Sequence, residues 1–245
     1  MQRFASFDGA PIAYQVIGEG RPTLLLHGFL ATADLNFIQP GIAARVAREG
    51  RQVILPDLRG HGASAGPEGA AAYPADALAM DQDALLNHLG ITDYDLVGYS
   101  LGARTAMRML VRGARPKRVV LGGMGDSGIM QVAARRAFFA DGITNGANAK
   151  NPQAGAYIRA AIAERGLSAG AMLNVLAQQV DTTAAELAVI DMPMLIVSGE
   201  DDADNGSAEK LAAFLPNALA QRVPGNHLTT VMAPELAEAI AGFLG

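Results

Sequence analysis

Three serines of this chain sit in the pentapeptide Gly-x-Ser-x-Gly, a pattern typical of a serine that acts as a nucleophile. They are Ser64, Ser100 and Ser168. A serine hydroxyl in such a setting attacks a carbonyl carbon, so the pattern indicates acyl transfer. Because glycine makes up 28 of the 245 residues, the pentapeptide arises easily by chance. The sequence around each serine must therefore decide among the three.

Only Ser100 has the surroundings that a nucleophile requires. Such a serine lies on a sharp turn between a buried strand and a helix, which exposes its hydroxyl at the carboxyl end of a sheet. The apolar run Tyr94–Val97 comes just before Ser100, and a helical pattern over 101–112 comes just after it. Ser64 has no strand directly before it, and Ser168 follows a helical segment. We interpret both as loop or helix-boundary residues and expect Ser100 to be the nucleophile.

The rest of the chain alternates short apolar runs with helical patterns, which predicts the α/β class. An alternating stretch around Asp8-Gly9 predicts a hairpin near the start of the chain. The apolar runs are typical of buried parallel strands and cover Thr23–Leu26, Gln52–Leu55, Tyr94–Val97, Arg118–Leu121, Met194–Val197 and, more weakly, Ala220–Val223. Helical patterns cover Ile42–Glu49, Asp76–Leu89, Leu101–Arg112, Ala208–Leu215 and Pro234–Leu244.

One long segment interrupts this alternation. Between residues 126 and 189 no strand is predicted, only alanine-rich helical stretches at Val132–Ala140, Tyr157–Arg165 and Ala171–Val180. Long insertions in a compact domain are usually functional, and helices over a sheet edge enclose a pocket. We therefore predict a core built from residues 1–125 and 190–245, with residues 126–189 inserted as a helical cap.

The composition excludes several other kinds of protein. With no Cys, the chain has no cysteine nucleophile, disulfide or thiolate metal site. The net charge of −5 and the lack of a basic stripe argue against nucleic acid as a partner. No apolar stretch approaches the roughly 18 residues of a membrane span, and the first residues lack the apolar core of a signal peptide. We expect a cytoplasmic protein with no membrane partner.

Four motifs in order along the chain resemble the α/β-hydrolase fold family over nearly the whole chain. They are His27-Gly28-Phe29, Asp57-x-Arg59-Gly60-His61-Gly62-x-Ser64, Gly98-Tyr99-Ser100-Leu101-Gly102, and Gly199…Asp202 followed by Gly225-Asn226-His227. The resemblance implies a mostly parallel, doubly wound sheet of about eight strands, with the helical cap inserted after the sixth. It also implies structural roles in loops for His27 and His61, while His88 is expected at the surface near the end of a helix.

The resemblance further implies a catalytic triad. A serine needs an imidazole to take its proton and a carboxylate to orient that imidazole. The family's chain order of Ser, Asp and His matches Ser100, Asp202 and His227. Asp202 is chosen because the family's acid stands three residues after the glycine that ends its strand. Asp201 is the next candidate, and Asp126 corresponds to the position that some relatives use.

The same resemblance places the other parts of the site. The backbone N–H groups of Phe29 and Leu101 correspond to an oxyanion hole. We expect neither a cofactor nor a metal ion. Apolar side chains from the core and the cap are expected to line a substrate pocket, namely Leu30, Tyr99, Met124, Phe138, Phe139 and Met172.

These residues predict a hydrolase that cleaves a small or medium apolar carboxylic ester. Related dehalogenases and epoxide hydrolases have an aspartate where this chain has Ser100, and many perhydrolases have a Trp that this chain lacks. Hydrolases of ring-cleavage products usually have Asn in place of Tyr99, so carbon–carbon bond cleavage remains an alternative, as does lactone cleavage. A ligand-binding protein without catalysis is a further alternative. The sequence leaves open whether the protein is a monomer or a homodimer.

Overall fold

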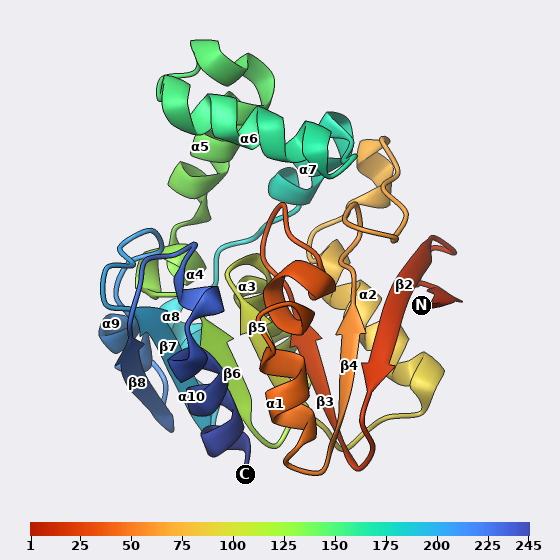
Figure 1. Ribbon diagram of the computed structural model, residues 1–245, viewed down its shortest axis with the longest axis vertical. Coiled ribbons are helices and arrows are strands. Elements are labelled where there is room, and N and C mark those ends of the chain that lie inside the picture. The colour runs from red at the N-terminus through yellow and green to blue at the C-terminus, as the bar shows by residue number, and fades with distance from the viewer.

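A computed structural model describes residues 1–245, and its centre is a single eight-stranded sheet (Figure 1). The strand order is β1-β2-β4-β3-β5-β6-β7-β8. β2 pairs antiparallel with β1 and β4, and all other neighbouring strands are parallel. The α/β prediction is thereby confirmed. The strands are β1 (Gln2–Ala5), β2 (Pro11–Ile17), β3 (Arg21–Leu26), β4 (Arg51–Pro56), β5 (Asp95–Tyr99), β6 (Val119–Gly122), β7 (Met194–Gly199) and β8 (Ala218–Val223).

Helices cover both faces of the sheet because successive strand residues point to opposite faces. Along β3, Leu24 and Leu26 belong to the core packed under α2 and α3, whereas Leu25 belongs to the core under α1 and α10. Each of these leucines is fully buried. A strand that is buried on both faces is therefore apolar at successive positions, which gives a continuous apolar run in the sequence. The helices of these faces are α1 (Ile42–Ala47), α2 (Ala77–Leu89), α3 (Leu101–Val111), α9 (Ala208–Ala212) and α10 (Pro234–Leu244).

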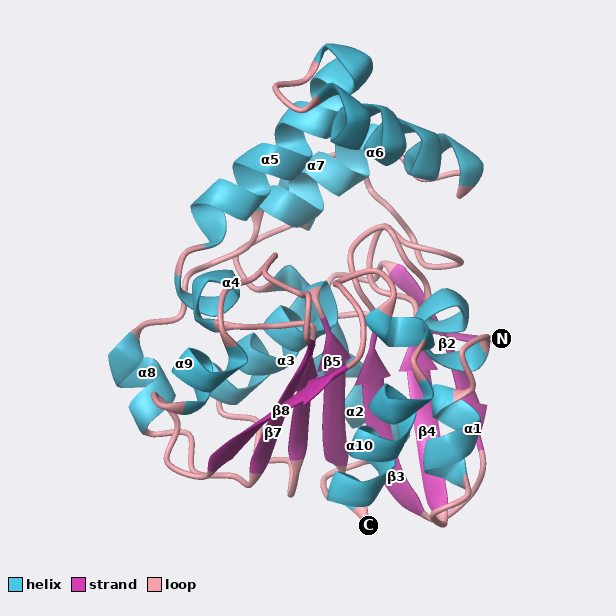
Figure 2. Cartoon of the chain, turned by 60° about the vertical axis from the view of Figure 1, so that its left-hand side comes forward, coloured by secondary structure: helices cyan, strands magenta, loops and turns pink.

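A helical insert separates β6 from β7. Three of its helices form a layer beyond the carboxyl ends of the parallel strands, and we call this layer the cap (Figure 2). The cap consists of α5 (Val132–Asn145), α6 (Pro152–Glu164) and α7 (Ala169–Ala177). The two remaining helices of the insert, α4 (Asp126–Met130) and α8 (Ala184–Ala188), lie beside the core. Residues 126–189 thus remain our proposal for the inserted domain, of which the cap is the part over the sheet edge.

Two helices of the cap begin earlier than the sequence patterns suggested. α6 starts at Pro152, where the side chain of Asn151 accepts a hydrogen bond from the N–H of Ala154. α7 starts after Ser168, whose hydroxyl accepts a bond from the N–H of Ala171. The capping side chains of Asn151 and Ser168, and the proline in the first turn of α6, mark helix starts. The spacing of the apolar residues alone does not show these starts.

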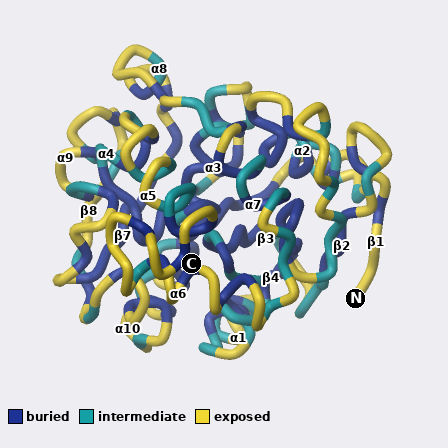
Figure 3. Tube along the Cα trace, turned by 90° about the horizontal axis from the view of Figure 1, so that it is seen from above, coloured by how far each residue is buried: buried dark blue, intermediate teal, exposed yellow.

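β5, β6 and β7 are buried at every residue, whereas the edge strands β1 and β8 carry exposed residues, as do the outer helices and loops (Figure 3). None of the helices is long and apolar enough to span a lipid bilayer.

Candidate active site

Ser100 lies on a strained turn between β5 and α3. Its φ of 53° and ψ of −111° fall in a region that non-glycine residues rarely adopt. The turn is tight because the strand and helix cross closely at two glycines. A Cβ atom on Gly98 would lie 2.3 Å from the carbonyl oxygen of Gly102, and one on Gly102 would lie 1.8 Å from that of Leu26. The glycines of the pentapeptide therefore permit the conformation that exposes the Ser100 hydroxyl.

His227 lies within hydrogen-bonding distance of this hydroxyl. It comes from the loop between β8 and α10, and its Nε2 atom is 2.9 Å from Ser100 Oγ. Its Nδ1 atom is 2.9 Å from Oδ2 of Asp202. The structure thus brings together the three side chains that the sequence singled out, in the linear order serine, imidazole, carboxylate. This arrangement lets the imidazole accept a proton from the serine while the carboxylate holds its orientation.

Asp202 is the only one of the three candidate acids that contacts His227. It is buried, and its second oxygen accepts the N–H of Asp204 at 3.1 Å. Burial alone would raise the pKa of Asp202, but the hydrogen bonds from His227 and from the Asp204 backbone outweigh it and hold this pKa below its usual value. Asp201 is exposed, and Asp126 instead accepts a backbone N–H at residue 207.

The backbone N–H groups of Phe29 and Leu101 make no hydrogen bond within the protein. Leu101 is the first residue of α3, so its N–H has no acceptor in the helix. Phe29 follows Gly28, whose N–H donates to the side chain of Asn36 at 2.7 Å. A Cβ atom on Gly28 would lie 3.2 Å from Asn36 Oδ1 and 3.4 Å from the Cβ of Ser100, so this loop lies directly beside the serine. Stabilisation of an oxyanion needs free hydrogen-bond donors beside the attacking hydroxyl. The N–H groups of Phe29 and Leu101 are two such donors beside Ser100.

His27 and His61, which are fully buried, connect the loops around the site by hydrogen bonds. The N–H of Leu58 donates to His27 Nε2 at 2.9 Å, and the N–H of Leu30 donates to His61 Nε2 at 3.2 Å. Burial lowers the pKa of His27 to about 4 and that of His61 to about 3. Both imidazoles are therefore neutral at pH 7, as an acceptor nitrogen must be.

The remaining serine and histidine candidates lie in structural positions. Ser64 donates to the backbone carbonyl of Asp57 and so closes its own loop. Ser168 caps α7 and donates to Glu68 at 3.0 Å. His88 is exposed on α2 and stacks on Phe4 with the ring centres 5.4 Å apart.

A cavity of about 630 Å³ opens between the core and the cap at Ser100 and His227. Four of the side chains expected at a pocket line it, namely Leu30, Tyr99, Phe138 and Phe139. The other apolar lining residues are Ala31, Leu35, Ala154, Tyr157, Ile158, Leu228, Val231 and Met232, and Phe29 also lines it.

Met124 and Met172 do not line this cavity, contrary to the expectation for them. Both are almost fully buried in the apolar core. Met172 packs toward Gly60, and the sulfur of Met124 packs toward Gly128. Methionine at helical spacing fits core and pocket equally well, and only the orientation of the backbone decides between them.

Two arginines connect the cap to the core. The sequence patterns did not identify either of them as a site residue. Arg135 on α5 forms an ion pair with Asp204 at 2.8 Å, two residues after Asp202. Arg165, just after α6, donates to the backbone carbonyl of Leu30. Both arginines line the cavity. No local pattern in the sequence distinguishes them from the other surface arginines of a helix.

Comparison with known proteins gives a consistent picture of the fold. A family model described as alpha/beta hydrolase fold matches residues 22–121. A fluoroacetate dehalogenase from a Burkholderia species is 40% identical over 111 residues, which are 44% of this chain and only 35% of that protein. The chain therefore spans about a third of the length of this curated relative.

Structural similarity extends over the whole chain. A hydrolase from Pseudomonas aeruginosa PA01 matches with a TM-score of 0.78 at 25% identity, covering 100% of this chain and 98% of that one. A thermophilic esterase from Thermogutta terrifontis matches with a TM-score of 0.76 at 24% identity, covering 100% and 98% of the two chains. Both matches thus cover the cap of this chain as well as its core.

Proposed function

Because the chain belongs to the α/β-hydrolase superfamily, we propose that it is a serine hydrolase that cleaves carboxylic esters through an acyl-enzyme intermediate. The observation that carries this proposal is the pair of hydrogen-bonding distances that connects Ser100 to His227 and His227 to Asp202, each 2.9 Å. Ser100 and His227 line the cavity. The similarity to a known esterase agrees with the proposal. The serine nucleophile separates the proposal from dehalogenation, which the family performs with an aspartate at this position.

In the first half of the reaction, Ser100 Oγ attacks the carbonyl carbon of the ester and its proton passes to His227 Nε2. The negative charge that forms on the carbonyl oxygen is stabilised by the N–H groups of Phe29 and Leu101. The bond between the carbonyl carbon and the alcohol oxygen then breaks, and His227 returns the proton to that oxygen. The alcohol leaves, and the acyl group stays on Ser100.

In the second half, a water molecule takes the place of the alcohol. Its oxygen attacks the acyl carbon while His227 accepts its proton, and the bond to Ser100 Oγ breaks as His227 reprotonates this atom. Asp202 remains ionised throughout and stabilises the imidazolium form of His227. The products are a carboxylic acid and the free enzyme, so no cofactor is required by this sequence of steps.

The proposal is tested with a fluorophosphonate probe, which labels an activated serine, followed by mass spectrometry of the peptides. We expect the label on Ser100, its loss in Ser100→Ala, and full labelling in the control Ser168→Ala, which removes a serine of the same pentapeptide pattern. Folded protein that takes up no label at Ser100 would contradict the proposal and favour ligand binding without catalysis.

The type of bond is tested by a panel of substrates. We expect hydrolysis of p-nitrophenyl esters of short and medium chain length, since the cavity beside Ser100 is largely apolar. A lactone and a vinylogous 1,5-diketone serve as probes for lactone and carbon–carbon cleavage. If the protein cleaves the diketone and none of the other substrates, the proposed function of the same three residues changes from ester hydrolysis to carbon–carbon bond hydrolysis.

A further inference from the structure

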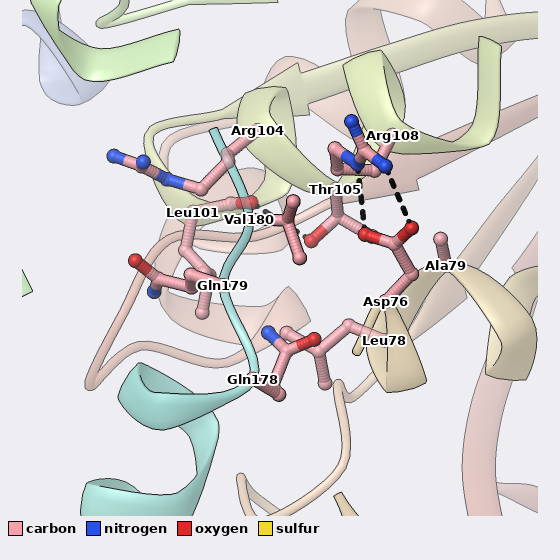
Figure 4. A pocket seen from close by; sticks show the side chains of 10 residues that line it. All are labelled: Asp76, Leu78, Ala79, Leu101, Arg104, Thr105, Arg108, Gln178, Gln179 and Val180. Carbon is pink, nitrogen blue, oxygen red and sulfur yellow. Dashed lines mark hydrogen bonds and ion pairs between the residues drawn. The ribbon is translucent and has the colours of Figure 1, made fainter. Parts of the chain in front are cut away.

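Arg104 is a buried cation with no partner. It lies one turn after Ser100 on α3, and its backbone N–H donates to the carbonyl of Ser100 at 3.1 Å. The residue is only 6% exposed, its guanidinium forms no ion pair, and its Nη1 atom is buried without any hydrogen bond. Arg108, one turn further on, differs in this respect because it pairs with Asp76 at 2.8 Å. In Figure 4 the side chain of Arg104 points away from that pair.

Arg104 and the proposed nucleophile Ser100 line the same small cavity. About 20 Å³ of this space is open to the centre of a water-sized group. It shares Phe29, Ser100, Arg135 and Phe139 with the large cavity and is therefore a side pocket of it. Its other lining residues are Leu101, Leu176, Gln179 and Asn205.

The charges around the side pocket leave one cation unbalanced. Arg135 is already paired with Asp204. Asp181 attracts Arg104 from a distance, but its carboxylate accepts the N–H of Val132 and makes no bond to Arg104. Burial and the neighbouring charge of Arg135 lower the pKa of Arg104 to about 10, so the group is still protonated at pH 7. A protonated arginine that is buried and unpaired is unfavourable for the folded state unless an anion completes the site.

We propose that Arg104, assisted by Arg135, binds a carboxylate of the substrate, so that the preferred substrates are esters that carry a second, free carboxylate on a short acyl chain. A guanidinium presents two parallel N–H groups that match the two oxygens of a carboxylate. The inference rests on the proposed function because it takes Ser100 as the atom that attacks the ester.

The test compares two isosteric methyl esters by pH-stat, monomethyl succinate and the neutral methyl levulinate. We expect wild-type protein to show a higher kcat/KM for the succinate ester. Since a hydrogen-bonded charge pair contributes 1.5–3 kcal/mol, Arg104→Met is expected to lower the ratio of the two kcat/KM values by about 10- to 100-fold. Arg104→Lys restores part of this ratio. The matched control is Arg136→Met, which removes an equal charge from the cap outside both cavities. Equal losses on both esters, or no wild-type preference, would overturn the proposal.

A binding measurement keeps the inference distinct from the hydrolase proposal. Titration calorimetry of succinate into the Ser100→Ala variant needs no turnover. We expect binding that Arg104→Met weakens by at least tenfold in the same background. If neither ester is cleaved and Ser100 takes no fluorophosphonate label, the hydrolase proposal fails while this titration still decides on the subsite. Failure of succinate to bind would reject the subsite even if esters are cleaved.

Thermal unfolding separates a binding role from a structural one. Because the Arg104 guanidinium makes no hydrogen bond or ion pair within the protein, Arg104→Met is expected to unfold at the same temperature as wild type or at a higher one. A clear fall in Tm would assign Arg104 to the structure of α3 and overturn the proposal.

Discussion

The hydroxyl of Tyr99 donates a hydrogen bond to the backbone carbonyl of His227 at 2.7 Å. The residue next to the proposed nucleophile thus fixes the backbone of the proposed base, and the centres of the two rings lie 5.7 Å apart. Gly122 and Gly123 make room for this contact, since a Cβ atom on either would lie 2.8 Å from the Tyr99 ring. The turn that exposes Ser100 and the loop that carries His227 are therefore joined by one side chain.

Tyr99→Phe is expected to lower kcat by roughly tenfold with little change in KM, because the imidazole loses its backbone anchor but the cavity keeps its shape. It should also lower the free energy of unfolding by about 1–2 kcal/mol, since a buried carbonyl loses its donor. Steady-state kinetics and urea denaturation measure the two effects. Tyr94→Phe, just before the same strand, is the control, and an unchanged kcat in Tyr99→Phe would contradict the anchoring role.

Of the three candidate acids, Asp202 alone is expected to matter for turnover. Asp202→Asn should lower kcat by roughly 10³- to 10⁴-fold, because an amide in this place favours the wrong tautomer of His227. Asp201→Asn and Asp126→Asn should stay near wild type, since neither side chain contacts the imidazole. Hydrolysis rates of a p-nitrophenyl ester decide the matter. A near-normal rate in Asp202→Asn would remove it from the triad.

The protein should lose stability as the pH falls below about 6.5, because of His27 and His61. Burial lowers the pKa of these groups in the folded protein to about 4 and about 3. Between these values and the unfolded pKa of about 6.5, the unfolded state binds more protons, so stability rises with pH and is lost on acidification.

Each histidine contributes at most about 1.4 kcal/mol per pH unit to this slope. Urea denaturation from pH 7.5 to 4.5 measures it. His27→Asn and His61→Asn, which retain an acceptor at these positions, should each make the slope shallower. A slope that neither variant changes would show that other groups cause the acid sensitivity.

Gly102→Ala is expected to destabilise the fold by more than about 4 kcal/mol, because the added methyl would lie 1.8 Å from the carbonyl oxygen of Leu26. Gly242→Ala is the matched control. Gly242 also lies inside a helix, α10, but has open space around its Cβ position, so alanine should stabilise the protein by about 0.5–1 kcal/mol. Denaturant unfolding of both variants provides the measurement. Similar stabilities for the two would mean that the crossing at the elbow is looser than described.

The strands and the turn at Ser100 were predictable because their signals are local. Each buried strand is a short apolar run, and Ser100 is marked by the strand before it and the helix after it. Contacts between distant segments leave no such mark. The ion pair of Arg135 with Asp204 depends on how the cap is placed over the core. The burial of Met172 in the core, away from the cavity, depends on the same placement. The missing partner of Arg104 is likewise visible only when all its neighbours are in place.

The two arginines that tie the cap to the core bind beside different parts of the site. Arg135 holds the loop of the proposed acid at Asp204, and Arg165 holds the loop of the proposed oxyanion donor at Leu30. The segment from α5 to α7 is therefore not an interchangeable module. A protein engineer who transplants it to alter substrate range must also supply both attachment points in the recipient core, or the graft will leave two active-site loops without anchors.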